Sequence, residues 1–178
     1  MCRYAAIAYK PHYACFDCRK TFKRRLMWDI QRGADDKAEA RCPQCGALMA
    51  NMGKDFEAPK MSDQKAWRHI AELYKVGIAF HSCGCTGPGY IPSDADALRR
   101  YFEEQLADVE TQLRFWRARE EPETSRLKQS EYDRKWEHLR QVPKKYWEDK
   151  ETISNAAAVE FWLGRFHEIE AKLGQLSR

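Results

Sequence analysis

The chain has 178 residues, of which 33% are charged and 43% hydrophobic, and its formal net charge is +4 at pH 7. This length allows one domain or two small ones, and an aromatic content of 12% argues against an intrinsically disordered chain. The sequence contains no run of about 18 apolar residues, so no membrane span is predicted. The N-terminal stretch also lacks the apolar core and cleavage site of a secretory signal.

Two cysteine pairs stand in the N-terminal half, Cys15-Phe-Asp-Cys18 and Cys42-Pro-Gln-Cys45-Gly, with 23 residues between them. The Cys-x-x-Cys spacing lets one tight turn direct both thiolates to the same metal ion, and two such turns complete a tetrahedral structural zinc site. The chain has seven cysteines, an odd number that fits metal binding in a reducing compartment better than a disulfide framework. We therefore expect one structural Zn²⁺ bound by these four cysteines, in a cytoplasmic protein.

Two alternatives are that the four cysteines are simply buried apolar residues, or that they include a redox dithiol pair. A redox Cys-x-x-Cys motif needs no second pair and usually lies in a thioredoxin-like strand–helix pattern, which is missing here. Four thiolates also fill the coordination shell of zinc, so no position is left for a catalytic water. The pattern therefore favours a structural metal over a zinc hydrolase.

The segment from Tyr13 to Phe22 begins like the first half of a two-Cys, two-His zinc finger, Tyr-x-Cys-x-x-Cys-x-Lys-x-Phe. No pair of histidines follows at the required distance. Instead, Cys42-Pro-Gln-Cys45-Gly46 resembles the knuckle of a zinc ribbon. This resemblance covers about residues 12–50 and implies a small antiparallel sheet around the metal. Zinc ribbons bind DNA, RNA, ribosomes, RNA polymerase or other proteins, so the resemblance implies a fold rather than one function.

A basic and aromatic stretch follows the first pair of cysteines. Its cations could contact a phosphate backbone while its aromatic rings stack on bases. The alternative is a solvated hairpin whose aromatic side chains pack on the metal core. Charge is also uneven along the chain, with a balance of +6 over residues 1–92 and −2 over residues 93–178. The candidate nucleic-acid-binding residues are Lys20, Phe22, Lys23, Arg24, Arg25 and Trp28.

Residues 51–92 are predicted to contain one helix and a glycine-rich loop. Ser62 is a candidate N-cap, an apolar stripe runs from Ala66 to Tyr74, and Gly77 ends the helix. Residues 78–80 are expected to form a short strand.

The glycine-rich loop that follows carries His81, Cys83 and Cys85. These three residues could hold a second metal ion, or one of the thiols could act as a nucleophile. The remaining alternative is a tight structural loop.

The composition changes at Pro92, because all seven cysteines and all but two of the glycines precede it. A helix is predicted to start at Ser93, with Asp96 completing a capping box, and to end before Pro122. A second helix is expected from about Thr124 to Gln141, and a third near the C-terminus. Apolar residues spaced alternately by four and three indicate a coiled-coil-like seam on the first and last helices. The seam residues are Phe102, Leu106, Val109, Leu113 and Trp116, then Trp162, Phe166, Ile169, Leu173 and Leu176.

The sequence therefore predicts an α+β protein with a zinc-ribbon domain over residues 1–92 and a helical hairpin or three-helix bundle over residues 93–178. The leading functional hypothesis is a non-enzymatic zinc module that docks on nucleic acid or on a ribonucleoprotein or transcription surface. The alternatives are a protein–protein adaptor that binds through the C-terminal helices, and a thiol-dependent enzyme at Cys83 or Cys85. The chain is expected to be a monomer or a homodimer paired through its seams. No catalytic constellation is recognisable, which favours a protein without enzymatic activity.

Overall fold

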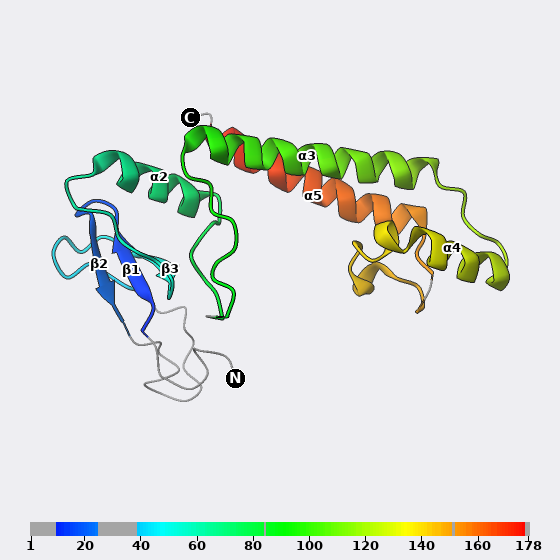
Figure 1. Ribbon diagram of the computed structural model, residues 1–178, viewed down its shortest axis with the longest axis horizontal. Helices are drawn as coiled ribbons and strands as arrows, with labels where there is room; N and C mark the ends of the chain where they lie inside the picture. Colours follow the sequence, from blue (N-terminus) through cyan, green and yellow to red (C-terminus); the bar gives the residue numbers. More distant parts are fainter. Residues whose placement is uncertain (1–9, 25–38, 84, 151, 177–178) are drawn as a thin grey trace. The chain divides into compact units, whose positions relative to one another are not determined.

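A computed structural model describes residues 10–24, 39–83, 85–150 and 152–176 of the chain (Figure 1). The chain divides into two compact units, residues 1–98 and 99–178. The first contains a small antiparallel sheet and a helix and the second is helical, so the predicted α+β class is confirmed. The predicted domain limit at residue 92 remains a prediction. None of the helices in the described ranges combines the length and the apolar character that crossing a membrane requires.

The sheet of the first unit has three short strands, β1 (His12–Cys15), β2 (Lys20–Lys23) and β3 (Ala50–Gly53). Both neighbours of β1 are antiparallel to it, which gives the strand order β2-β1-β3. Tyr13 lies opposite Phe22 on β2 and opposite Asn51 on β3. Residues that lie opposite one another share a face of the sheet, so these three side chains are on the same face. The small antiparallel sheet expected from the sequence is therefore present, and β2 is one of its two outer strands.

Helix α2 (Gln64–Lys75) packs its buried face on this sheet. Trp67 and Ile70 form one core cluster with Ala14, Ala50, Met52 and Phe56. The predicted cap at Ser62 is wrong by one residue, since the Asp63 side chain accepts the N–H of Ala66 at 3.0 Å. The predicted stop at Gly77 is correct: Gly77 has φ +85°, and the N–H of Ile78 bonds to the Leu73 carbonyl at 2.8 Å. This pattern is a Schellman motif, which needs a left-handed residue at that position.

Residues 78–80 do not form the predicted strand, but the backbone of Phe80 is attached to β3. Its N–H bonds to the Met52 carbonyl at 2.8 Å, and its carbonyl accepts the N–H of Asp55 at 3.2 Å. The approach is very close, because a Cβ atom added to Gly53 would lie 2.4 Å from the Phe80 oxygen. A glycine is therefore required at position 53 of β3, where the backbone just before the glycine-rich loop comes closest.

The second unit contains α3 (Ala95–Ala118), which begins in the first unit, then α4 (Ser125–Leu139), the short 3₁₀ helix η1 (Lys144–Tyr146) and α5 (Asn155–Leu176). Helices α3 and α5 lie side by side in Figure 1. They are antiparallel, since the Lys172 ammonium lies over the Phe102 ring at one end and Asn155 bonds to Arg119 at the other. Several predicted seam residues are buried: Phe102, Val109, Leu113, Trp116, Trp162 and Ile169. The predicted cap at Ser93 is replaced by Asp94, which accepts the N–H of Ala97 at 2.8 Å.

A buried ion pair connects the three long helices of the second unit. The guanidinium of Arg119 donates to both carboxylate oxygens of Glu131, at 3.0 and 2.7 Å. It also donates to the Ile153 carbonyl at 2.9 Å and to the Asn155 side chain at 2.7 Å, and it lies 5.1 Å from the ring centre of Trp116. A buried charge is tolerated when its hydrogen bonds are satisfied in this way. The residues just after α3, within α4 and at the start of α5 are therefore joined at one point.

Candidate metal centre

The two cysteine pairs lie on two tight turns of the first unit. The first turn leads from the end of β1, at Cys15, to the start of β2. In the second turn the Cys42 carbonyl accepts the N–H of Gly46 at 2.9 Å, and the Cys42 N–H donates to the Ala47 carbonyl at 2.8 Å. The residue after the second cysteine is left-handed in both turns: Gly46 has φ +76° and Arg19 has φ +50°. A non-glycine residue seldom adopts this conformation, so its presence at Arg19 marks a turn whose shape is imposed by its surroundings.

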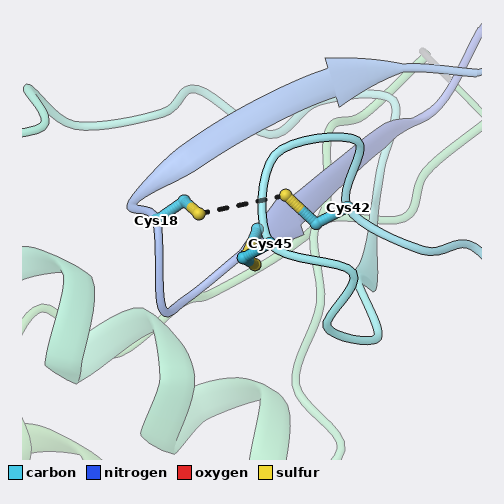
Figure 2. A group of neighbouring side chains, drawn as sticks. Cys18, Cys42 and Cys45 are labelled. Carbon is cyan, nitrogen blue, oxygen red and sulfur yellow. Dashed lines mark hydrogen bonds between the residues drawn. The ribbon is translucent and has the colours of Figure 1, made fainter.

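The four cysteine sulfurs converge from these turns and all lie within 4.8 Å of one another. The Sγ atoms of Cys15 and Cys45 are 3.6 Å apart, and those of Cys18 and Cys42 are 4.0 Å apart (Figure 2). A tetrahedral site with metal–sulfur bonds of about 2.3 Å has sulfur–sulfur edges of about 3.8 Å. A disulfide would need about 2.05 Å. The four side chains therefore have the spacing of a tetrathiolate metal site.

Backbone hydrogen bonds favour a thiolate at the first cysteine of each turn. Burial opposes ionisation of Cys42, but hydrogen bonds from the N–H groups of Cys45 and Gln44 outweigh it and lower the pKa of Cys42 to about 7. Burial raises the pKa of Cys15, although the Cys18 N–H acts in the opposite direction. The hydrogen bond with Cys45 is the first cause that raises the pKa of Cys18 to about 12. Four thiols this close compete for protons, and a bound dication would replace those protons.

The centre is closed on one side and open on the other. Cys15 and Cys42 are buried, Cys18 is half-buried and Cys45 is exposed. The Lys20 ammonium donates to the Gln44 side chain at 2.7 Å and so connects β2 to the second turn. The metal centre is therefore next to the start of the basic strand.

The predicted nucleic-acid-binding residues lie mainly on this outer strand. Lys20 and Lys23 are exposed, whereas Phe22 is half-buried opposite Tyr13. Arg24 donates to the Glu39 carbonyl at 3.5 Å. Among the described residues, no carboxylate lies within 4 Å of the cationic groups of Lys20, Lys23 and Arg24. Two further candidates, Arg25 and Trp28, fall outside the described residues.

One of these cations, Lys23, lies opposite His12 on the neighbouring strand β1. Burial lowers the pKa of His12, and the charge of Lys23, opposite it on β2, lowers it further. Burial is the larger cause, and the smaller part reflects repulsion between a protonated His12 and the nearby Lys23 ammonium.

The other candidate ligands, His81, Cys83 and Cys85, are all exposed on the glycine-rich loop. Within the described ranges, the Cys15, Cys18, Cys42 and Cys45 cluster is where three or more ligand atoms gather at metal-binding distance. A second metal site or a reactive thiol on this loop remains a prediction.

Sequence reasoning missed a groove beside the metal centre. It has a volume of about 600 Å³ and is lined by residues of the first turn, of the segments that flank the second turn, of β3 and of α2. We call it the knuckle groove, and its walls include Tyr13, Phe16, Glu39, Leu48, Asn51, Tyr74 and Lys75. Tyr74 was expected within the apolar stripe of the helix, yet it is 39% exposed, and Leu48 is 57% exposed. The position of Tyr74 at the end of that stripe is a weak signal that its ring lies at the margin of the core.

Comparison of the chain with protein-family models, with curated proteins and with solved structures finds no match.

Proposed function

We propose that this protein is a non-enzymatic binding module whose first unit is held together by one zinc ion and docks on nucleic acid through β2. The observation that carries the proposal is the convergence of the four cysteine sulfurs, with cross-turn spacings of 3.6 and 4.0 Å. Four sulfur ligands with tetrahedral spacing are typical of structural zinc, or of iron bound by thiolates. In the zinc site of this proposal, the four thiolates leave no open position for catalysis.

The metal would act by fixing the two turns against one another. Cys15 ends β1, Cys18 precedes β2, and Cys42 and Cys45 belong to a segment more than twenty residues further along the chain. One ion bound to all four would therefore set the position of β2 relative to the second turn.

The proposed docking surface is the basic outer strand beside this centre. Lys20, Lys23 and Arg24 have no carboxylate partner within 4 Å among the described residues, so no ion pair there offsets their charge. Cations that are not already paired can neutralise phosphates and release their counterions. This favours a polyanion as the partner.

Metal analysis and a salt titration test the two halves of the proposal separately. We expect one zinc ion per chain by mass spectrometry of the native protein, and none in a Cys15→Ser, Cys42→Ser double variant. For nucleic acid, we expect the affinity to fall steeply with salt, and the log–log slope to become shallower by about two in a Lys23→Ala, Arg24→Ala variant. A chain that holds zinc but binds neither RNA nor DNA at low salt would contradict only the docking half.

A protein–protein adaptor is the second candidate, favoured by two large apolar side chains exposed on α4. Leu127 is 51% exposed and Trp136 is 40% exposed. A pull-down from the source cell, with and without nuclease, separates the two candidates. Partners that survive nuclease treatment and are lost on Leu127→Ser, Trp136→Ser substitution would support the adaptor.

A further inference from the structure

We propose that the knuckle groove binds one unstacked base of a single-stranded nucleic acid whose phosphates lie on the basic strand β2. This inference rests on the proposed docking function and assigns it a base-binding site. The groove, at about 600 Å³, is in the range of cavities that bind small organic ligands. It is therefore large enough for a nucleobase.

The walls of the groove offer aromatic and apolar surface to such a base. Tyr74 is 39% exposed, and its ring lies 6.0 Å from the ring of Phe16, tilted by 54°. Phe16 is half-buried and packs on the core, so it supports the Tyr74 ring from one side. Leu48, 57% exposed, adds apolar surface. Aromatic side chains held in this way stack on bases of any sequence.

The side-chain amide of Asn51, which lines the groove, can donate a hydrogen bond to the edge of a base. The Asn51 carbonyl oxygen accepts the backbone N–H of Gly53 at 3.1 Å. Because that N–H can only donate, the atom facing it must be the oxygen, and the amide nitrogen with its two donors remains. Among the described residues this nitrogen has no hydrogen-bond partner. It can donate to a carbonyl of a base such as uracil or thymine.

The charges around the groove favour a ligand that carries phosphate. Lys75 lines the groove, and the one carboxylate among its described lining residues, Glu39, is paired with Arg41 at 2.9 Å. Of the β2 cations, Lys20 lies at the groove end of the strand, because it is opposite Cys15, which precedes Phe16 of the groove wall; β1 separates the rest of β2 from β3. A purely apolar peptide would gain nothing from these charges.

The groove also predicts that base binding depends on the metal. Phe16 stands between Cys15 and Cys18 in the first turn, so a metal bound by these cysteines fixes the residue that supports Tyr74. Loss of the metal should therefore remove base binding along with the turn.

The test measures binding of the zinc-loaded full chain to fluorescein-labelled oligonucleotides by anisotropy. The probes are a 12-nucleotide oligo(U), a 12-nucleotide oligo(dT) and a duplex of the same length. We expect Tyr74→Ala to weaken oligo(U) or oligo(dT) binding about tenfold, because stacking on one aromatic side chain is lost. Tyr74→Phe keeps the ring and should stay within about twofold of the native affinity. Tyr90→Ala is the matched control, since Tyr90 is 67% exposed in the same unit and lies outside the described lining of the groove.

The outcomes separate this inference from the docking proposal. If oligonucleotide binding depends on Lys23 and Arg24 but is unchanged by Tyr74→Ala, the docking proposal stands and the base site is overturned. A duplex bound as tightly as the single strands would also overturn it, since the bases of a duplex are stacked. Absence of binding to all three probes by the zinc-loaded chain would overturn both proposals. The zinc content of each variant shows that its first unit is folded.

Discussion

The two units of this protein are stabilised in different ways. The first has strands of four residues and a core that includes two alanines, Ala14 and Ala50, beside Met52, Phe56, Trp67 and Ile70. The buried side chains of the second include Trp116, Leu139, Ile153 and Ile169, contributed by several helical segments. Both units bury large side chains, for example Leu73 in the first and Val142 in the second, so the size of the buried side chains does not separate them. The difference lies in the length of the elements, because the strands of the first unit have four residues each whereas α3 and α5 have 24 and 22. Short strands in a small sheet are marginally stable alone, so we expect the first unit to depend more on a cross-link than the second.

Each unit nevertheless contains one polar cluster that joins segments distant in sequence. In the first unit it is the four thiols, which bring Cys15 within 3.6 Å of Cys45. In the second it is Arg119 with Glu131 and Asn155. The second cluster brings its own opposite charges, whereas the four thiols of the first would ionise together only if an external cation replaced their protons. This contrast predicts that metal removal and charge removal act on different halves of the chain.

Metal removal should have the largest effect. Metal binding contributes about 10–16 kcal/mol to the folding of zinc-finger peptides at neutral pH. We expect a chelator such as EDTA, or Cys42→Ser, to abolish slow amide exchange in β1, β2 and β3 while α3 and α5 stay protected. Hydrogen-exchange mass spectrometry resolves the two units in one experiment. The control is Cys85→Ser, which removes a cysteine outside the cluster, and equal loss of protection in that variant would contradict the assignment.

Removal of Arg119 should have the next largest effect and should be confined to the second unit. Arg119→Ala leaves Glu131 buried with Lys135 as its remaining cationic partner, and such changes cost about 3–5 kcal/mol. Urea unfolding followed by helical circular dichroism measures this loss. Arg165→Ala is the control, because its ion pair with Glu168 is exposed and is worth at most about 1 kcal/mol.

The comparison would fail if Arg119→Ala lowered zinc content or if both arginine variants unfolded at the same urea concentration. The first outcome would mean that the two units fold as one. The second would mean that the buried cluster is no more important than a surface pair.

Two glycine substitutions, Gly53→Ala and Gly77→Ala, test how the backbone of Phe80 is attached to β3. Gly53→Ala should destabilise by about 3 kcal/mol, because the new Cβ meets backbone atoms of Phe80 and the residue is left-handed, with φ +91°. Gly77→Ala has the same backbone strain but open space around its Cβ, so it should cost about 1–2 kcal/mol. Thermal unfolding of the zinc-loaded variants measures both. Equal losses would mean that the contact with Phe80 relaxes without cost.

Local patterns predicted the parts of this fold that depend on local geometry. The spacing of the cysteines predicted their convergence, since a Cys-x-x-Cys turn places both sulfurs on one side whatever the rest of the chain does. Apolar periodicity predicted the helices. The caps were displaced by one residue, to Asp63 and Asp94, because serine and aspartate are both good caps and only the backbone geometry chooses between neighbours.

What the sequence did not reveal depends on contacts between distant segments. One arginine in a chain with 33% charged residues carries no sign that it will be buried, and Arg119 is 7% exposed. The apolar triplet at residues 78–80 was expected to be a strand, yet its attachment to β3 is limited to bonds at Phe80. The knuckle groove is formed by two turns, a strand and a helix, so no local pattern predicts it.

The smallest expected effect is a pH response that belongs to the second unit. Burial opposes ionisation of Glu131, but hydrogen bonds and charges from Arg119 and Lys135 outweigh it and hold the pKa of Glu131 below its ordinary value. A lowered pKa in the folded state stabilises the fold above the ordinary glutamate value of about 4.3, and this stabilisation is lost as the pH falls through the folded value. We therefore expect the urea concentration at which half of the helical signal is lost to decrease as the pH is lowered below about 4.3. Glu131→Gln should be less stable at pH 7 and should flatten this part of the profile, whereas Glu168→Gln, at an exposed pair, should flatten it less. An unchanged profile in Glu131→Gln would mean that the buried carboxylate does not couple folding to pH.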